Sequence, residues 1–323
     1  MKHLELRTSD SCMKISKLVL GTDYFGTGVS ESEAFKIMDI YQEAGGNCLD
    51  TARMYASWLP GGEGASERTL GKWMKTRGCQ NKMIISTKGG HPQLNDMNRG
   101  RLSQKEIESD LDESLKVLGV DYIDIYWLHR DDVSRPVEDI AATMTKLIRK
   151  GKIRAAGCSN WKSDRIEELN QFAAENGMEP FAASQIQWSL ASSTPEAHDD
   201  STLVCMNEKE YEWYLKNKLP VFAFSSQAKG FFTKVVKQGI EVVSQKAYSR
   251  FATADNFSRL ERVKRYADES GLSVSAVVLG YITENRFPAA AIIGCKNCEQ
   301  LEDSLTAADV SIPPQSVDWL YKG

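Results

Sequence analysis

Short apolar runs alternate with longer segments of helical periodicity along most of the chain. Eight of these runs are rich in β-branched or aromatic residues and are followed by glycine or polar residues, as strands are before loops. Their shortness predicts strands rather than helices. They span residues 17–21, 47–50, 83–88, 122–128, 153–157, 181–187, 221–225 and 289–293.

The segments between these runs carry helix signals. Ser30 and Ser103 are each followed three positions later by Glu, which is the pattern of a capping box. Apolar residues then recur at helical spacing, as at Ile107 and Leu111, and glycine follows. Eight strands that alternate with helices predict an α/β fold, a (β/α)8 TIM barrel that forms a single domain over residues 1–323. An open doubly wound sheet fits less well, because no Gly-x-Gly-x-x-Gly turn follows the first strand.

The two longest irregular stretches follow strands, at residues 188–206 and 230–257. Loops after the strands of such a barrel cover its active face, so we expect both stretches to form loops or lids there.

Four polar residues lie at or just after the ends of three successive apolar runs. Asp50 closes the second run and Tyr55 follows it. Lys88 closes the third run, and His129 comes directly after the fourth. If these runs are neighbouring parallel strands, the acid, the phenol, the amine and the imidazole converge at one edge of the sheet. Such a group is typical of a proton-transfer site.

The chemistry of these side chains favours carbonyl reduction. A tyrosine phenol has a pKa of about 10 and is a poor acid near neutral pH. We expect the ammonium group of Lys88 to lower the pKa of Tyr55, and Asp50 to keep Lys88 charged and oriented. His129 would donate a hydrogen bond to a substrate carbonyl or share in proton transfer. The four residues suit the addition of hydride to a carbonyl while Tyr55 supplies the proton.

At these residues the chain resembles the aldo-keto reductase superfamily, over approximately residues 14–310. Asp50-Thr-Ala-x-x-Tyr55 with Gly64-x-Ser-Glu67 is similar to one family signature. Leu115-x-x-Leu118-Gly-x-Asp-Tyr-x-Asp124, leading to His129, is similar to another. The resemblance implies a (β/α)8 barrel, a nicotinamide cofactor bound without a Rossmann fold, and Tyr55 as the proton donor.

The resemblance also implies a cofactor site built from loops after the strands. Ser159, Asn160 and Gln185 match residues that bind the nicotinamide carboxamide. Phe224 matches an aromatic residue, usually Tyr, that stacks on the nicotinamide ring. The loop after the first strand, the pyrophosphate loop and the adenosine end complete the implied set: Gly21, Thr22, Asp23, Ser225, Ser226, Gln227, Lys229, Gly230, Gly294, Lys296, Gln300, Asp303 and Ser304.

Two features of this set bear on the choice of cofactor. Asp303-Ser304 stands where the family usually has Glu-Asn, which changes the contacts expected with adenine. Lys296 offers a cation for a 2′-phosphate, so the sequence favours NADP(H) over NAD(H). A solvated loop lysine is the alternative for this residue.

Aromatic residues in the loops after strands predict the substrate pocket. Tyr24 and Trp58 are placed to wall it, and His91 adds a polar group near the mouth, with Asp131 and Asp132 close by. Aromatic rings with a polar rim favour a hydroxylated small molecule such as a sugar, polyol or cyclitol. Simple aromatic aldehydes are also compatible with this pocket.

Composition narrows the partners and the compartment. The net charge is −4 and no run of Lys or Arg occurs, which argues against nucleic acid and anionic membranes as partners. No apolar stretch approaches the roughly 20 residues of a membrane span, and no signal peptide is apparent. Seven scattered cysteines therefore predict reduced thiols and a cytoplasmic location. Cys295 and Cys298 have a metal-like spacing but lack further ligands, so no metal is predicted.

Two other functions are compatible with the same barrel. Lys88 would be the Schiff-base nucleophile of a lyase if its pKa were depressed, but an Asp50 partner favours the charged form. Some members of the family that the chain resembles are cofactor-sensing regulatory subunits of membrane channels, a role that does not need the four polar residues. The physiological substrate, the direction of the reaction and the oligomeric state stay open.

Overall fold

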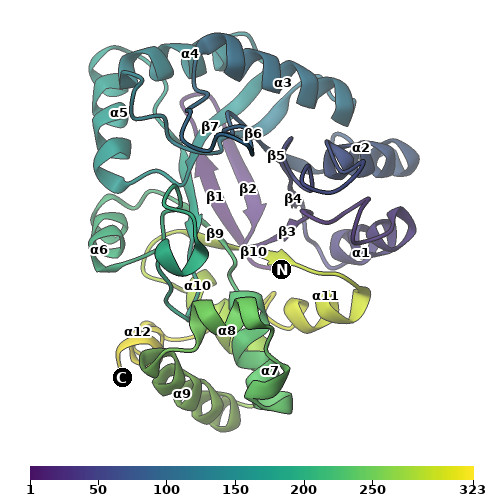
Figure 1. Ribbon diagram of the computed structural model, residues 1–323, viewed down its shortest axis with the longest axis vertical. Coiled ribbons are helices and arrows are strands. Elements are labelled where there is room, and N and C mark those ends of the chain that lie inside the picture. Colours follow the sequence, from purple (N-terminus) through teal and green to yellow (C-terminus); the bar gives the residue numbers. More distant parts are fainter.

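A closed barrel of eight parallel strands forms the centre of the computed structural model, which describes residues 1–323 (Figure 1). Around the barrel the order is β10-β3-β4-β5-β6-β7-β8-β9, so successive strands lie side by side. Each strand matches one of the eight predicted runs, with ends that differ by at most two residues. The bounds are β3 (Leu18–Gly21), β4 (Cys48–Asp50), β5 (Ile84–Gly89), β6 (Ile123–Leu128), β7 (Ile153–Ser159), β8 (Ala183–Gln187), β9 (Val221–Phe224) and β10 (Ala289–Gly294). The predicted (β/α)8 barrel is therefore confirmed.

Helices surround the barrel and begin where the capping signals predict (Figure 1). Ser30 Oγ accepts a hydrogen bond from the Glu33 amide at 3.2 Å, and Ser103 and Glu106 form a complete capping box. None of the helices combines the length and apolar character needed to cross a membrane. They are α1 (Glu31–Glu43), α2 (Ala65–Arg77), α3 (Gln104–Leu118), α4 (Val137–Arg149), α5 (Ser163–Glu175), α6 (Glu208–Asn217), α7 (Phe231–Gln238), α8 (Gln245–Phe251), α9 (Ala254–Ser270), α10 (Val274–Thr283), α11 (Cys298–Leu305) and α12 (Pro314–Lys322), with 3-10 turns η1 (Glu196–His198), η2 (Ala228–Gly230) and η3 (Ile240–Val242).

One of the two stretches expected to be irregular is mostly helical. Residues 230–257 contain α7, η3, α8 and the start of α9, so that prediction is wrong. Buried Phe231 and Phe251 anchor the two short helices, and Ser244 caps α8. The helices are only eight and seven residues long, too short for a clear periodic signal. Residues 188–206 contain only η1 and otherwise form the loop that was expected.

An antiparallel hairpin of β1 (His3–Arg7) and β2 (Cys12–Ser16) lies across the amino end of the barrel (Figure 1). The sequence analysis missed it. Leu4, Leu6, Met13 and Ile15 are buried against the barrel, and the residues of β1 on either side of each leucine are exposed. This alternation is the pattern of a strand with one buried face, so the signal was present in the sequence.

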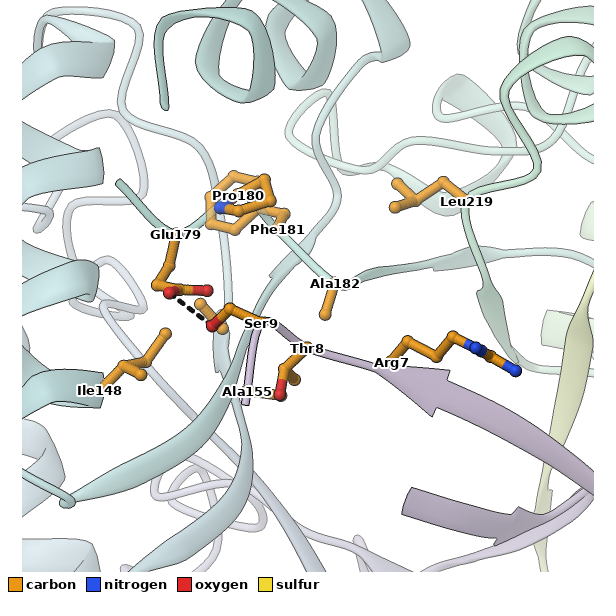
Figure 2. A pocket seen from close by; sticks show the side chains of 11 residues that line it. Arg7, Thr8, Ser9, Ile148, Ala155, Glu179, Pro180, Phe181, Ala182 and Leu219 are labelled. Atoms are coloured by element: carbon orange, nitrogen blue, oxygen red, sulfur yellow. Dashed lines mark hydrogen bonds between the residues drawn. The ribbon is translucent and has the colours of Figure 1, made fainter. Parts of the chain in front are cut away.

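A shallow cavity of about 220 Å³ opens between this hairpin and the amino ends of β7 and β8 (Figure 2). Arg7, Ser9, Glu179 and Phe181 are among the side chains around it, and Ser9 Oγ donates to Glu179 Oε1 at 2.6 Å. The cavity lies at the amino end of the barrel, opposite the carboxyl end where the four polar residues follow their strands. It is therefore separate from the candidate active site.

Large and small side chains alternate inside the barrel. The rings of Trp127 and Phe222 meet edge to face with their centroids 5.2 Å apart, while Ala155 and Ala183 leave room for them. Gly157 lies against the indole of Trp127, so that a Cβ added there would come within 2.3 Å of a ring carbon. A glycine at this strand position is thus required by the packing of Trp127.

Gly157→Ala should destabilise the protein by about 1–3 kcal/mol, because the added methyl group overpacks a buried ring. Urea denaturation of the variant and the parent protein measures the difference. Gly294→Ala is the matched control at the end of another barrel strand, since a Cβ there meets nothing within 4 Å. If both variants were as stable as the parent protein, the interior would have to be loosely packed around Trp127.

Candidate active site

The carboxyl end of the barrel brings the four polar residues together. Strand β4 pairs with β5 so that Asp50 lies opposite Ser86, and β5 pairs with β6 so that Lys88 lies opposite Trp127. This register places the ends of three neighbouring strands side by side. Tyr55 follows in the loop after β4 and reaches back over the strand ends.

Lys88 and Asp50 form a buried ion pair at the centre of the site. Lys88 Nζ lies 2.6 Å from Asp50 Oδ2, and each side chain is only 1% exposed. The ammonium also donates to the Tyr55 hydroxyl at 2.7 Å and to the Thr51 carbonyl at 2.9 Å. All three ammonium hydrogens therefore have acceptors, which a buried charge requires.

Side chains from β5 and β8 donate hydrogen bonds to the Asp50 carboxylate. Its Oδ1 accepts from Ser86 Oγ at 2.7 Å and from Gln185 Nε2 at 3.0 Å. Trp127 Nε1 in turn donates to Ser86 Oγ at 2.6 Å. Sequence reasoning missed Ser86 and Trp127, because neither has a signal of its own outside the fold. Gln185, which the family resemblance assigned to the nicotinamide, directs its amide nitrogen to Asp50.

Tyr55 keeps its proton in the free protein. Burial, and then the negative charges of Asp50 and Asp23, raise the pKa of Tyr55 well above its usual value. The expectation of a lowered pKa is therefore wrong for the free protein, because burial and the two carboxylates outweigh the opposing charge of Arg130. The hydroxyl accepts from Lys88 and donates to Asp50 Oδ2 at 3.2 Å.

His129 is a neutral ring beside the phenol. Its centroid lies 6.1 Å from the Tyr55 ring and 4.7 Å from the His91 ring, edge to face with both. Burial and the neighbouring positive charges lower the pKa of His129 well below its usual value. Nδ1 of this ring has no hydrogen-bond partner in the protein. The backbone amide of His129 donates to the Gly89 carbonyl at 2.8 Å, which fixes the residue next to β5.

Arg130, the next residue, was not among the predicted site residues. Its guanidinium donates to the His129 carbonyl at 3.0 Å, to Thr202 Oγ1 at 2.9 Å and to Asp200 Oδ2 at 3.2 Å. It therefore connects the loop after β8 to the site, and its charge acts on the Tyr55 phenol against the effect of burial. An arginine beside a histidine carries no distinguishing sequence signal.

The predicted cofactor residues lie around the same carboxyl end. Thr22 donates from both its amide and its hydroxyl to the Asp50 carbonyl, each at 3.0 Å. Asn160 adopts a left-handed backbone with φ of 60°, and its amide nitrogen contacts the His129 carbonyl at 3.3 Å. At strand ends or directly after them lie Gly21, Thr22, Asp23, Ser159, Asn160, Phe224, Ser225 and Gly294.

The loop after β9 turns sharply through left-handed backbone conformations. Ser226 Oγ donates to the Ile292 carbonyl at 2.6 Å, and Gln227 Nε2 contacts Ser304 Oγ at 3.3 Å, so the loop is tied to β10 and α11. Non-glycine residues in this region carry strain that clusters at ligand sites, and such turns form anion-binding concavities. The positive φ values are 53° for Ser225, 49° for Ala228, 55° for Lys229 and 77° for Gly230.

The predicted adenosine end lies at the start of α11. The Lys296 amide donates to Gln300 Oε1 at 3.0 Å. Asp303, which departs from the usual family residue, contacts Lys237 Nζ at 3.3 Å and also accepts from Ser275. Its carboxylate is thus occupied by protein donors.

A basic cluster borders this predicted cofactor region. We define it as Lys229, Lys246, Arg250 and Lys296. Burial, and then the positive charges of Arg250 and Lys246, lower the pKa of Lys229, with a smaller effect from Lys296. Mutual repulsion of this kind marks a site suited to an anion. Lys246 and Arg250 were missed because they lie on α8, in the segment expected to be irregular.

The three predicted substrate residues differ in their surroundings. His91 is buried and packs on His129, whereas Trp58 is 52% exposed on the loop after β4. Tyr24 lies with its ring centroid 5.5 Å from Lys296 Nζ, which puts it near the adenosine end. Asp131 pairs with Arg165 at 3.5 Å. The substrate role of these residues stays a prediction.

A (β/α)8 barrel with this group of side chains at its carboxyl end defines the class of protein, and comparison with known sequences gives the family. The model of the Aldo/keto reductase family matches residues 17–321, so the chain belongs to that family, whose members use nicotinamide cofactors. The chain is 26% identical to norsolorinic acid reductase from Emericella nidulans, over 94% of this chain and 77% of the relative.

Two other relatives are aryl-alcohol dehydrogenases. The one from Pestalotiopsis microspora is 24% identical over 100% of this chain and 82% of its own length. The one from Phanerodontia chrysosporium, whose name specifies NADP(+), is 26% identical over 92% of this chain and 77% of its own length. Family and relatives together support an oxidoreductase that interconverts carbonyls and alcohols.

The His91 environment makes the stability of the protein sensitive to acid. Burial and nearby Arg130 lower the pKa of His91 to about 4 from 6.5. The folded protein therefore binds this proton more weakly than the unfolded chain, and stability falls as the pH drops from 6.5 toward 4. We expect the loss from this residue to reach about 3 kcal/mol.

Unfolding free energies at pH 7 and pH 4.5 test this dependence in the parent protein and in His91→Gln. The variant should lose less stability in acid than the parent protein does, because Gln carries no proton. Equal losses in the two proteins would show that His91 is readily protonated in the folded state.

Proposed function

We propose that the protein is an NADP(H)-dependent oxidoreductase that interconverts a carbonyl compound and its alcohol, with Tyr55 as proton donor and acceptor. The observation that carries the proposal is the buried contact of the Tyr55 hydroxyl with Lys88 Nζ at 2.7 Å and Asp50 Oδ2 at 3.2 Å. A phenol between an ammonium and a carboxylate, beside a neutral imidazole, suits transfer of a proton to a carbonyl oxygen.

The four residues have distinct tasks in this proposal. Tyr55 holds its proton in the free protein and gives it to the substrate oxygen as that oxygen gains negative charge. Lys88 stabilises the phenolate that is left, and Asp50 balances and orients Lys88. His129 donates a second hydrogen bond to the same oxygen. General acid catalysis of this kind contributes about 10²–10⁴-fold to the rate.

The surrounding residues fit a nicotinamide dinucleotide phosphate. Asn160 and Ser159 supply polar groups for the carboxamide, and the ring of Phe224 supplies an apolar face for the nicotinamide. The left-handed turn over residues 225–230 and the basic cluster suit the pyrophosphate and the 2′-phosphate. The cofactor, when bound, supplies or accepts the hydride. The basic cluster favours the phosphorylated form of the cofactor through Lys296.

The other two functions fit the observations less well. Burial lowers the pKa of Lys88, as a Schiff-base lysine needs. Its amine is nevertheless 1% exposed and engaged by Asp50, Tyr55 and Thr51, so no substrate carbonyl can approach it. A regulatory subunit would have no use for the connected set of Asp50, Lys88 and Tyr55. A cytoplasmic location belongs to the proposal, since all seven cysteines are free thiols.

For the substrate we propose an aromatic or hydroxylated carbonyl compound. The names of the relatives point to aryl alcohols, and the site offers a buried imidazole at His91 whose Nδ1 donates to the Pro92 carbonyl at 2.6 Å. The other nitrogen of this neutral ring is then an acceptor for a substrate hydroxyl. Sugars, polyols and cyclitols stay within this proposal.

Tyr55→Phe should lower kcat by roughly 10²–10⁴-fold, because it removes the proton donor and keeps the aromatic ring. Reduction of a panel of aldehydes is followed by the absorbance of NADPH, and cofactor affinity by quenching of tryptophan fluorescence. Tyr122→Phe, a partly exposed phenol just before β6, is the matched control. A Tyr55→Phe enzyme as fast as the parent enzyme would refute the role of the phenol.

Lys296→Ala should weaken NADPH binding by roughly ten- to a hundredfold, since a charge-assisted contact contributes about 1.5–3 kcal/mol. NADH lacks the 2′-phosphate, so its Kd should hardly change. Titration of both cofactors measures the two effects, with the exposed Lys264→Ala as control. Equal weakening of both cofactors would contradict a phosphate role for Lys296.

Hydroxylated carbonyls should react with higher kcat/KM than partners that lack the hydroxyl, because a polar site is left unpaired by the deoxygenated compound. Matched pairs test this, such as a hydroxybenzaldehyde with benzaldehyde and glyceraldehyde with propanal. A consistent preference for the deoxygenated member would mean that the pocket is simply apolar.

A further inference from the structure

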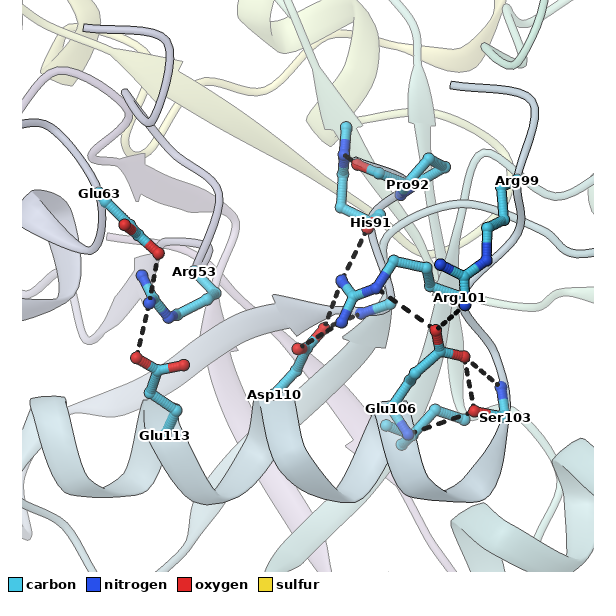
Figure 3. A network of polar contacts seen from close by, with 12 residues as sticks. Arg53, Glu63, His91, Pro92, Arg99, Arg101, Ser103, Glu106, Asp110 and Glu113 are labelled. Atoms are coloured by element: carbon cyan, nitrogen blue, oxygen red, sulfur yellow. Dashed lines mark hydrogen bonds and ion pairs between the residues drawn. The ribbon is translucent and has the colours of Figure 1, made fainter. Parts of the chain in front are cut away.

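A network of charged side chains connects α3 to the loops that carry the site residues (Figure 3). Glu106, Asp110 and Glu113 follow one another along one face of α3. Arg53, from the loop that leads to Tyr55, contacts Glu113 at 2.6 Å, and Arg101 contacts Asp110 at 2.9 Å. The proposed proton transfer uses none of these residues, so the network needs another explanation.

Arg101 and Asp110 hold the backbone directly after Lys88. The Gly90 amide donates to Asp110 Oδ2 at 2.8 Å, and Arg101 Nη1 donates to the His91 carbonyl at 2.9 Å. The two side chains also bind each other through two contacts, at 2.9 and 3.2 Å, and each is only 14% exposed. We call this pair the turn clamp.

The turn held by the clamp is closely packed on both sides. A Cβ added at Gly89 would come within 1.9 Å of the Tyr126 hydroxyl and 2.9 Å of Asp110 Cβ. Gly90 has a φ of 71°, and a Cβ there would meet Leu102 at 2.5 Å. Two successive glycines therefore allow the backbone to approach the side chains of β6 and α3 closely.

This turn leads directly to the two imidazole rings. The Gly89 carbonyl accepts from the His129 amide at 2.8 Å. The His91 ring then packs edge to face on the His129 ring at 4.7 Å and 72°. Since Nδ1 of His129 has no partner, packing against neighbouring rings sets the orientation of that imidazole. The position of His91 thus depends on the backbone that the turn clamp holds.

We propose that Arg101 and Asp110 are positioning residues that set the place of His91 against His129, and thereby the fit of the substrate carbonyl beside Tyr55. This inference rests on the proposed function. The turn clamp touches no residue expected to hold the cofactor, so its loss changes the productive fit of the substrate and leaves cofactor affinity as it is. A misplacement of about 1 Å costs up to a hundredfold in rate.

The network itself contains a matched control. Arg99, which is 67% exposed, contacts Glu106 at 3.3 Å in the outer part of the network and forms no hydrogen bond or ion pair with the turn or with a histidine. Arg99→Met removes one charge from the same network and should leave kcat/KM unchanged. Asp110→Asn and Arg101→Met break the turn clamp. Arg101→Lys keeps the positive charge but cannot form the bidentate contact with Asp110.

Two measurements on the full-length protein test the proposal. The first is kcat, KM and the Kd of NADPH for each variant. The second is the ¹H–¹³C spectrum of protein labelled in histidine, in which only four residues contribute ring signals. We expect Asp110→Asn and Arg101→Met to shift the His91 and His129 signals and to lower kcat/KM roughly ten- to a hundredfold at unchanged NADPH affinity. Arg101→Lys should restore part of the loss.

The proposal is overturned if the clamp variants fold, lose thermal stability and keep the histidine signals and kcat/KM of the parent protein. The clamp would then be a stabilising ion pair only. If Asp110→Asn does not fold, the histidine signals and kcat/KM of the two Arg101 variants test the proposal in the same way. If the parent protein reduces no carbonyl, the proposed function fails, and the histidine spectra still show whether the clamp sets His91.

Discussion

The buried ion pair of Lys88 and Asp50 is the interaction on which the site depends. Two charges that are 1% exposed are costly to desolvate, and they persist only when every donor and acceptor is satisfied. Here Ser86, Gln185 and Thr51 supply protein partners, and the remaining contact falls to the Tyr55 hydroxyl. The hydrogen bonds of the Tyr55 hydroxyl with Lys88 and Asp50 therefore hold the phenol in place at the mouth of the barrel.

The strand register and the packing of the barrel interior place the hydrogen-bond partners of this ion pair. Neighbouring strands place Asp50 and Ser86 side by side, and Trp127 donates to Ser86 from the next strand. The indole fits because Gly157 has no side chain to obstruct it. The packing of the barrel interior therefore helps to orient the Asp50 carboxylate. In our proposal, the turn clamp orients the neighbouring rings of His91 and His129 in a similar way.

Much of the fold and the centre of the site could be predicted from the sequence. Eight β-branched or aromatic runs predicted the barrel, because the strand pattern can be read in short segments of sequence. Asp50, Lys88 and His129 were recognisable by their positions at strand ends, and Tyr55 by its place in the loop after β4. Other features depend on tertiary contacts that no short pattern reveals. Ser86, Trp127 and Arg130 are ordinary residues until the fold brings them to the site, and Lys246 and Arg250 lie on a helix too short to detect. The predicted direction of the pKa shift of Tyr55 was wrong, because the shift depends on burial, which is a property of the folded chain.

The dependence of Tyr55 on the ion pair is tested most directly by kcat across pH for Lys88→Met, a side chain of similar shape without the charge. The account predicts that kcat falls by roughly a hundredfold or more, since the phenol then gives up its proton with no cation to stabilise the phenolate. The Kd of NADPH should stay the same. An enzyme that kept the kcat and the pH profile of the parent protein would contradict the account, because Tyr55 would then act without Lys88.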